Sequence, residues 1–76
     1  MPLALDVTIK RCNLRYWRQK AGYTQRELAV LAGVRESTVS DIERLESEPK
    51  ITTAIKLATL CNCTLDDLYE FDIRRR

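Results

Sequence analysis

The sequence predicts an all-α fold, a compact bundle of five short helices. Three observations support this prediction. Apolar residues recur every three or four positions in five successive segments, which is the period of helices that bury one face. Residues that end helices or start turns separate these segments, namely Gly22, Gly33, Pro49 and Asn62. The strict alternation of apolar and polar residues that indicates a strand is nearly absent.

The first two helices are bounded by clear signals. The first is expected over residues 9–21, with Gly22 as its end. The second begins after Thr24, which stands three residues before Glu27. This is the spacing of a capping box, in which each side chain bonds a free backbone amide of the other residue. Gly33 ends the second helix, because the left-handed conformation of a tight turn costs glycine less than a residue with a Cβ.

Three further helices follow this turn. The third is expected over residues 35–44, so the pair of helices around the turn forms a helix-turn-helix. Pro49 precedes the fourth helix and Asn62 ends it. Thr64 and Asp67 repeat the capping pattern before a short fifth helix. The side chains expected to face inward are Ile9, Leu14, Trp17, Ala21, Leu28, Leu31, Ala32, Val34, Val39, Ile42, Ile51, Ile55, Leu57, Ala58, Cys61, Leu65 and Leu68.

The N-terminus shows the one strand-like pattern of the chain. Apolar residues alternate with other residues at Leu3, Leu5, Val7 and Ile9. A short β-arm here could pair with the same segment of a second copy. We favour the alternative of a loose tail before the first helix, because a lone short strand has no partner for its backbone groups. The expected division is an N-terminal arm over residues 1–8, a helix-turn-helix domain over residues 9–70 and a basic C-terminal tail over residues 71–76.

The composition fits one folded domain. With 76 residues there is room for a single core, and the apolar share of 45% and the charged share of 32% are ordinary for a folded domain. No apolar run approaches the roughly 20 residues that a membrane span requires. The first ten residues, MPLALDVTIK, lack a basic leader, a long apolar stretch and a cleavage site. We therefore expect a cytoplasmic protein that has no membrane partner.

Catalytic and metal-binding chemistry is not indicated. The three cysteines, Cys12, Cys61 and Cys63, are odd in number, which argues against a disulfide framework. Cys61 and Cys63 could supply half of a metal site, but the chain has no histidine and a structural zinc usually takes four ligands. Histidine is also the usual general base near neutral pH. We expect no enzyme activity, no metal and no cofactor.

Residues at many positions follow a known order. They are Arg18, Thr24-Gln25, Leu28-Ala29, Gly33-Val34, Val39, Ile42-Glu43, Pro49, Leu57-Ala58, Asn62, Leu65 and Leu68. In this order residues 9–68 resemble the helix-turn-helix domain of phage repressors and Cro-like regulators, the XRE family. The resemblance implies that the second helix lies across the DNA backbone, while the third enters the major groove with its first turn at base edges.

The resemblance also implies roles for individual residues. The residues implied to read base edges are Glu36, Ser37, Thr38 and Asp41. The residues implied to contact phosphates are Gln25, Arg26, Arg35 and Arg44. The alternative for each of these residues is a solvent-exposed side chain without a ligand. Arg18 and Glu43 match a mostly buried ion pair that joins the first helix to the third, and Cys61 and Cys63 match core positions that the family fills with leucine and valine.

The charge of the implied DNA surface is unusual. Residues 24–48 hold three arginines and six acidic residues, a net charge of −3, and a phosphate backbone repels negative charge. The family also usually has a glycine where Leu45 stands and basic residues in the loop that follows. Positive charge lies instead at Lys10, Arg11, Arg15, Arg18 and Lys20 of the first helix and at Arg74, Arg75 and Arg76. These cations either border the groove or only keep the domain soluble.

The sequence therefore predicts a transcriptional regulator that binds specific double-stranded DNA, with residues 35–44 as the recognition helix. Glu36 and Asp41 would favour C·G pairs, because a carboxylate can accept a hydrogen bond from cytosine N4, and Arg35 could orient Glu36. A homodimer on a palindromic operator is expected, since one small domain contacts too few bases to be selective. We expect no small-molecule effector.

The sequence leaves the dimer contacts and a second function open. Dimer contacts are expected first in the last helix and residues 69–73, and second in the arm at residues 3–9. The alternative function is a protein-interaction module, of an antitoxin-like or regulator-binding kind, which keeps the bundle without strong DNA binding. It would use the acidic loop and the apolar side chains Tyr69, Phe71 and Ile73.

Overall fold

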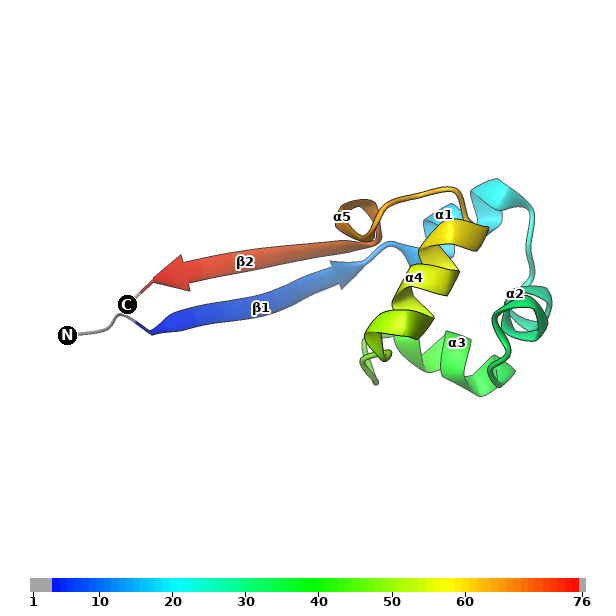
Figure 1. The fold of residues 1–76 in the computed structure, drawn as a ribbon, viewed down its shortest axis with the longest axis horizontal. Coiled ribbons are helices and arrows are strands. Elements are labelled where there is room, and N and C mark those ends of the chain that lie inside the picture. Colours follow the sequence, from blue (N-terminus) through cyan, green and yellow to red (C-terminus); the bar gives the residue numbers. More distant parts are fainter. Residues whose placement is uncertain (1–3, 76) are drawn as a thin grey trace.

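Five helices and two strands are present in the computed structural model, which describes residues 4–75. Their order is β1 (Leu5–Cys12), α1 (Leu14–Ala21), α2 (Gln25–Ala32), α3 (Glu36–Glu43), α4 (Ile51–Leu60), α5 (Leu65–Leu68) and β2 (Tyr69–Arg75). Leu3 of the expected arm and Arg76 of the expected tail lie outside the described residues. Figure 1 shows the helices gathered at one end and the two strands extending from them as a ribbon.

The five predicted helices are confirmed, and their ends follow the predicted signals. Thr24 Oγ1 accepts the backbone N–H of Glu27 at 3.1 Å, while a Glu27 carboxylate oxygen accepts the backbone N–H of Thr24 at 3.0 Å. The capping box at the start of α2 is therefore complete. Thr64 and Asp67 repeat this arrangement at α5. α2 ends at Gly33, whose φ of 71° lies in the left-handed region.

The predicted start of the first helix at residue 9 is wrong, because α1 begins only at Leu14. The backbone of residues 9–12 belongs to β1 and pairs with β2. Asn13 then donates its backbone N–H to the Leu68 carbonyl at 2.7 Å, which fixes the junction between strand and helix. Long-range strand pairing overrides the local helical pattern here, as tertiary context commonly does.

The core lies among the five helices. Six large side chains are 0% exposed, namely Leu14, Leu28, Val39, Ile42, Leu57 and Leu68. Along α4 the buried stripe has the spacing i, i+3, i+4 and i+7 and consists of Ala54, Leu57, Ala58 and Cys61. The prediction that Leu31, Ile51 and Ile55 face inward is wrong, since they are 55%, 65% and 48% exposed. They flank the stripes along which α2 and α4 pack against each other.

β1 and β2 form a two-stranded antiparallel sheet, so the prediction of an all-α fold is only partly correct. The strand pattern near the N-terminus is real. The expectation of a loose tail is wrong for residues 5–9, because they pair with the C-terminal segment of the same chain. Residues 71–75, expected in a basic tail, belong to β2. The paired strands are far apart in sequence, so no local pattern indicates this pairing.

One face of the ribbon is apolar. Residues that lie opposite each other in an antiparallel pair share a face. The opposite pairs Val7–Ile73 and Ile9–Phe71 place four apolar side chains on the same face. Leu5 continues this face toward the end of the ribbon, where it lies opposite Arg75.

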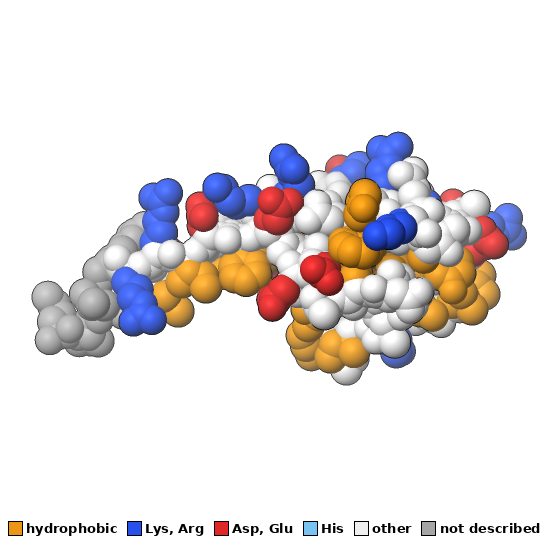
Figure 2. Space-filling view, turned by 90° about the horizontal axis from the view of Figure 1, so that it is seen from above, with side chains coloured by type: hydrophobic (Ala, Val, Ile, Leu, Met, Phe, Trp, Pro, Cys, Tyr) orange, Lys and Arg blue, Asp and Glu red, His pale blue; other side chains and the backbone are white. Residues whose placement is uncertain are grey.

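The other face of the ribbon is charged. The register shifts between Ile9 and Arg11, which leaves Lys10 as the extra residue of a bulge. Lys10 Nζ lies 3.3 Å from Asp72 Oδ2, and Arg11 Nε lies 3.8 Å from Glu70 Oε2. Figure 2 shows apolar side chains gathered along one edge of the ribbon and charged side chains along the opposite edge.

The base of the ribbon is joined to the helices. Trp17 Nε1 of α1 donates to the Asp67 carbonyl of α5 at 3.2 Å. Cys12 and Tyr69 lie opposite each other where the strands meet the helices, and both are half-buried against the core. Burial raises the pKa of both side chains. These contacts anchor one end of the ribbon, while its other end extends away from the helices.

Candidate nucleic-acid interface

α2 and α3 meet at a tight corner. Gly33 adopts a φ of 71°, and the backbone N–H of Val34 donates to the Ala29 carbonyl at 3.0 Å. Val34 also packs against the core, which fixes the corner relative to the bundle. Arg35 has an extended backbone and is the N-cap of α3. The first turn of α3, directly after Arg35, is exposed at residues 36 and 37.

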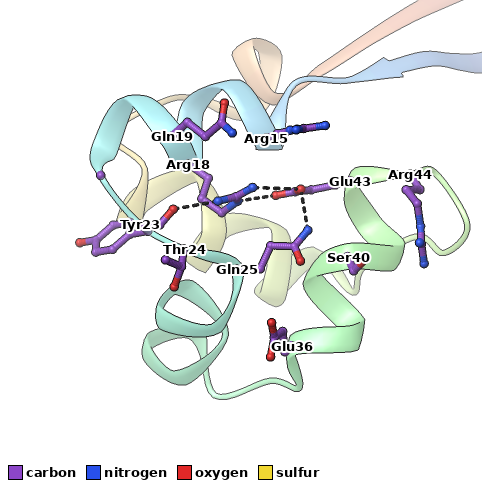
Figure 3. Close-up of a pocket in the computed structure, with 11 residues that line it drawn as sticks. Arg15, Arg18, Gln19, Tyr23, Thr24, Gln25, Glu36, Ser40, Glu43 and Arg44 are labelled. Carbon is purple, nitrogen blue, oxygen red and sulfur yellow. Dashed lines mark hydrogen bonds and ion pairs between the residues drawn. The ribbon is translucent and has the colours of Figure 1, made fainter.

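Arg18 of α1 is the centre of a buried hydrogen-bond network, which Figure 3 shows. Its Nε lies 2.7 Å from Glu43 Oε2 of α3, and its Nη1 donates to the Tyr23 carbonyl at 2.8 Å. Gln25, the first residue of α2, donates from Nε2 to Glu43 Oε1 at 3.0 Å. The side chains of Arg18 and Glu43 are 9% and 5% exposed. The network therefore ties α1, the start of α2 and the end of α3 together.

Gln25 retains a donor for a ligand. Its side-chain amide has two N–H groups, of which one bonds Glu43. Gln25 is half-buried at the amino end of α2, where the helix dipole and free backbone N–H groups favour an anion. The bond to Glu43 thus orients the side chain that the resemblance assigns to a phosphate.

The outward face of α3 carries polar residues at positions i, i+1, i+4 and i+5, namely Glu36, Ser37, Ser40 and Asp41. Glu36 and Ser37 are exposed, whereas Ser40 and Asp41 are half-buried. Thr38, which was also expected to read base edges, is half-buried. The structure therefore brings three of the four expected base-reading residues onto one face, together with Ser40.

The carboxylates of this face differ in their partners. Asp41 Oδ1 lies 3.1 Å from Arg44 Nη2, and Glu46 Oε2 lies 3.2 Å from the same nitrogen. Within residues 4–75 Glu36 has no ion-pair partner, so the expected orientation by Arg35 is not formed. Glu36 is accordingly free to accept a hydrogen bond from a ligand.

Most acidic side chains of residues 24–48 have an internal hydrogen-bond or ion-pair partner. Four of the six acidic residues have partners within the domain, namely Glu27, Asp41, Glu43 and Glu46. Glu27 is held in the capping box, where the hydrogen bond from the Thr24 backbone lowers its pKa. Among residues 4–75, Arg18 is the one partner from outside this segment, and it offsets only Glu43. The segment therefore stays negatively charged beside a phosphate.

The expected phosphate-binding arginines also differ in whether they form ion pairs within the domain. Arg26 and Arg35 are exposed, and within the described part of the chain neither forms an ion pair. Arg44, whose side chain is 59% exposed, is bound by Asp41 and Glu46. Both carboxylates contact Arg44 Nη2, so they offset part of the positive charge that Arg44 presents to a phosphate.

An open groove of about 780 Å³ lies between α1, the start of α2 and α3. Figure 3 shows Arg15 and Gln19 of α1 on one side of this groove and Ser40 of α3 on the other. No sequence motif indicated Gln19 or Ser40, and Arg15 was only one of several nearby cations. The i, i+3 spacing of Arg15 and Arg18 is the signal that places both on one helix face.

Leu45 occupies a turn that favours glycine. Its φ of 58° lies in the left-handed region, which costs a residue with a Cβ about 1 kcal/mol or more. The Leu45 backbone N–H donates to the Ile42 carbonyl at 3.2 Å, and that of Glu46 donates to the Asp41 carbonyl at 2.8 Å. The turn after α3 therefore keeps its shape despite the departure from glycine.

The cysteine thiols lie in or beside the core. All three are free, and burial raises the pKa of Cys61 to about 11, so this thiol is protonated at neutral pH. Among residues 4–75 no group of three or more side chains is arranged to hold a metal ion. No helix in that part of the chain has both the length and the apolar character to cross a bilayer.

Similarity to known proteins covers the whole helical region. A family model described as helix-turn-helix matches residues 14–68, from the first residue of α1 to the last residue of α5. The chain is an XRE-type helix-turn-helix protein. The two strands of this helix-turn-helix protein lie outside the matched residues.

Relatives of this helix-turn-helix protein are named as transcription regulators. An HTH-type transcriptional regulator of Archaeoglobus fulgidus is 39% identical over 62 residues, which are 82% of this chain and 89% of that protein. The SPbeta prophage-derived regulator YopS of Bacillus subtilis is 32% identical over 72 residues, 93% of this chain and 97% of the relative. ImmR of Bacillus subtilis is 40% identical over 60 residues, 79% of this chain and 47% of the relative.

Two solved structures share the fold. The restriction-modification controller protein C.AhdI of Aeromonas hydrophila has a TM-score of 0.66 and 31% identity, covering 72% of this chain and 83% of that one. The DNA-binding domain of the P22 C2 repressor has a TM-score of 0.66 and 30% identity, covering 71% of each chain. These similarities place the helix-turn-helix protein among DNA-binding transcription regulators.

Proposed function

We propose that this protein binds an operator in double-stranded DNA as a homodimer, with α3 in the major groove and the start of α2 against the backbone. The observation that carries the proposal is the exposed first turn of α3, held in place by the network of Arg18, Gln25 and Glu43. Base reading requires side chains on a rigid support. In a helix-turn-helix, the amino-terminal part of the second helix contacts base edges.

Glu36 and Ser37 make the first base contacts in this proposal, since both are exposed. The Glu36 carboxylate accepts a hydrogen bond from cytosine N4, which selects a C·G pair. Asp41 contributes one turn later and shares its carboxylate with Arg44. Thr38, at the side of this face, offers a hydroxyl and a methyl group. The operator is therefore expected to contain a C·G pair opposite the start of α3.

The DNA backbone is held by the remaining donor of Gln25 and by three arginines that have no ion-pair partner within residues 4–75, namely Arg15, Arg26 and Arg35. Each phosphate contact releases condensed counterions, so the dependence of affinity on salt increases with the number of contacts. Because only these few unpaired cations in the described part of the chain lie at the proposed DNA surface, we expect the affinity for DNA to depend only weakly on salt. Affinity must then come in large part from base contacts.

A two-fold operator follows from the size of the domain. One helix-turn-helix reads only a few base pairs, and dimers gain selectivity by placing two recognition helices in successive major grooves. Their centres are then about 34 Å apart, the length of one DNA turn. The expected site is an inverted repeat with that spacing or a multiple of it.

Selection from random duplexes at low salt tests the proposal. The wild-type protein is expected to enrich an inverted repeat. Glu36→Gln should shift the preferred base at one position of each half-site from cytosine toward adenine, because a glutamine amide pairs with adenine. Glu70→Gln, the same change on the charged face of the ribbon, is the matched control and should leave the selected site unchanged.

A backbone variant provides the second test. Arg26→Ala should weaken binding to all duplexes by a similar factor. It should reduce the salt slope by about 1 for each bound protomer, which is about 2 for the dimer. Glu36→Gln should change the preferred base without this loss of salt dependence. Enrichment of no sequence at low salt, or an unchanged base preference in Glu36→Gln, would contradict the proposal.

A protein-interaction module is the second candidate function. The observation that favours it is the exposed apolar face of the ribbon, on which Phe71 and Ile73 are 43% and 57% exposed. In that case the helix-turn-helix bundle serves as a scaffold and the ribbon contacts the partner. Failure to enrich any duplex, with the folded bundle retained, would favour this second function over operator binding.

A further inference from the structure

The apolar face of the ribbon continues into a groove at its base. The groove has a volume of about 340 Å³ and lies between the ribbon, the start of α4 and α5. Its apolar lining includes Pro49, Ile51, Tyr69 and Phe71. Ile51 is 65% exposed in this position. The groove is thus an open apolar site beside an apolar strand face.

The outer half of the ribbon carries apolar side chains that the chain itself does not cover. Leu5, Val7 and Ile73 are 58%, 59% and 57% exposed. Figure 1 shows that this half extends away from the helices. Val7 reaches the edge of the groove of its own chain, whereas Leu5 and Ile73 are not among the residues that line it. The side chains of this face point away from the two strands. They can therefore pack against a second sheet that lies about 10 Å away.

Charges at the two ends of this apolar surface are complementary. Glu48 and Asp66 line the groove at the base, and Arg75 lies at the outer end of the ribbon, opposite Leu5. Both acidic residues and Arg75 are exposed, and within residues 4–75 none of the three forms an ion pair. The base of one molecule therefore attracts the outer end of another.

We propose that a second copy of this chain covers the apolar face, with the outer end of each ribbon in the groove of its partner. A two-fold axis near the Val7–Ile73 pair places Leu5 and Arg75 of one copy over Phe71 and the acidic groove of the other. Such an isologous contact is closed and forms twice in each dimer. The inference deepens the proposed function, on whose homodimer it rests, by naming the dimer surface.

The size of the surface fits a dimer. Five large side chains, each more than two-fifths exposed, form the face and groove: Leu5, Val7, Ile51, Phe71 and Ile73. Together they expose on the order of 500 Å² of apolar area, which is enough to mark an interaction site. With the polar rim, this approaches the roughly 800 Å² that each partner contributes to a standard interface. The charged face, with Lys10 and Asp72 paired, stays in water.

Sedimentation equilibrium on the full chain tests the apolar contact. Val7→Thr with Ile73→Thr keeps residues that suit a strand but places hydroxyl groups in the interface. The dimer dissociation constant is expected to rise by at least about 10-fold, because four apolar side chains per dimer are affected. Thr8→Ala on the charged face is the matched control and should leave the constant unchanged. Circular dichroism verifies that each variant is folded.

A charge exchange tests the arrangement of the two copies. Glu48→Arg and Arg75→Glu should each weaken the dimer, since each variant brings two like charges together twice. The double variant should recover the wild-type dissociation constant. A mixture of the two single variants should also recover it, because Glu48 of one meets Arg75 of the other and the reversed pair forms on the opposite side. Only a contact between two copies predicts recovery in the mixture.

Three results would overturn the inference: a wild-type monomer at concentrations up to about 1 mM, a Val7→Thr/Ile73→Thr variant with an unchanged dimer, or a mixture that does not recover. DNA binding is measured separately on a duplex with one half-site. Retained binding to that half-site by the monomeric Val7→Thr/Ile73→Thr variant supports the ribbon as a dimer surface distinct from the reading surface. A dimer that enriches no duplex would support the ribbon contact and contradict the operator proposal.

Discussion

The helical body, residues 14–68, and the ribbon, β1 with β2, use similar side chains in different surroundings. The body buries six large apolar side chains completely, whereas the ribbon has exposed apolar side chains and no buried residue. The same contrast holds for ion pairs. Arg18 and Glu43 of the body are 9% and 5% exposed, and Lys10 and Asp72 of the ribbon are 61% and 41% exposed.

This contrast shows that the contribution of a contact to the stability of the fold depends on how deeply the contact is buried. A buried ion pair cannot lose one member without leaving an uncompensated charge, while an exposed pair is screened by water and contributes little. An apolar side chain stabilises the domain only in proportion to the area that folding removes from water. The body is therefore expected to fold by itself, and the ribbon to gain stability when its apolar face is covered.

The largest difference in the free energy of unfolding is expected between variants of the two ion pairs. Arg18→Met leaves Glu43 buried without its guanidinium partner and should lower the free energy of unfolding by about 3–5 kcal/mol. Lys10→Met in the ribbon should change it by less than about 1 kcal/mol. Urea denaturation followed by the fluorescence of the single tryptophan, Trp17, measures both. A small effect of Arg18→Met would show that the network is not needed for stability.

Truncation of a buried apolar side chain should give the next largest loss of stability. Leu28→Ala removes a side chain that is 0% exposed and should destabilise the protein by about 2–5 kcal/mol. Val7→Ala removes one that is 59% exposed and should cost under about 1 kcal/mol in the monomer. Leu31→Ala on α2 is the control for an exposed helix position. Thermal unfolding at low protein concentration compares the three without dimer formation.

Substitutions in two turns of the body should change stability in opposite directions. Gly33→Ala forces a Cβ into a φ of 71° with no atom within 4 Å to clash, so about 1–2 kcal/mol of backbone strain is expected. Leu45→Gly relieves the φ of 58° and should stabilise the domain by less than about 1 kcal/mol, because glycine also loosens the unfolded chain. Urea midpoints test both signs, and destabilisation by Leu45→Gly would contradict the strain argument.

The smallest effect is expected at the capping box of α2. The hydrogen bond from the Thr24 backbone lowers the folded-state pKa of Glu27 below its ordinary value of 4.5. The stability that it contributes is therefore fully present above pH 4.5 and is lost as the pH falls through the lowered folded pKa. Glu27→Gln should reduce the loss of stability between neutral and acid pH. Unfolding curves at several pH values test this, and an unchanged pH dependence would exclude a role for Glu27.

The helix ends that are set by local contacts can be predicted from the sequence. The capping residues Thr24 and Thr64 and the turn at Gly33 fix helix ends through bonds to near neighbours, so their positions follow from the sequence. The start of α1 does not, because residues 9–12 bond to β2 from the other end of the chain. The inward faces of α2 and α4 are similarly decided by helix packing, which leaves Leu31 and Ile51 exposed.

The candidate site shows the same limit. Residue type and order indicate the recognition helix and its polar face, but not which charges are already paired. Arg44 is engaged by Asp41 and Glu46, whereas within residues 4–75 Glu36 remains without an ion-pair partner. A side chain chooses among several neighbours only when the backbone brings them within reach, so spacing along one helix cannot predict the choice.

The sequence by itself determined the helix-turn-helix of this protein, because capping residues, glycine turns and apolar periodicity act over a few residues. Only the tertiary structure decided that the two ends of the chain join into a ribbon with one apolar face. The physical reason is distance along the chain. Strand pairing between residues 5–12 and 69–75 depends on the folded helices that bring these segments together, and no local pattern records that contact.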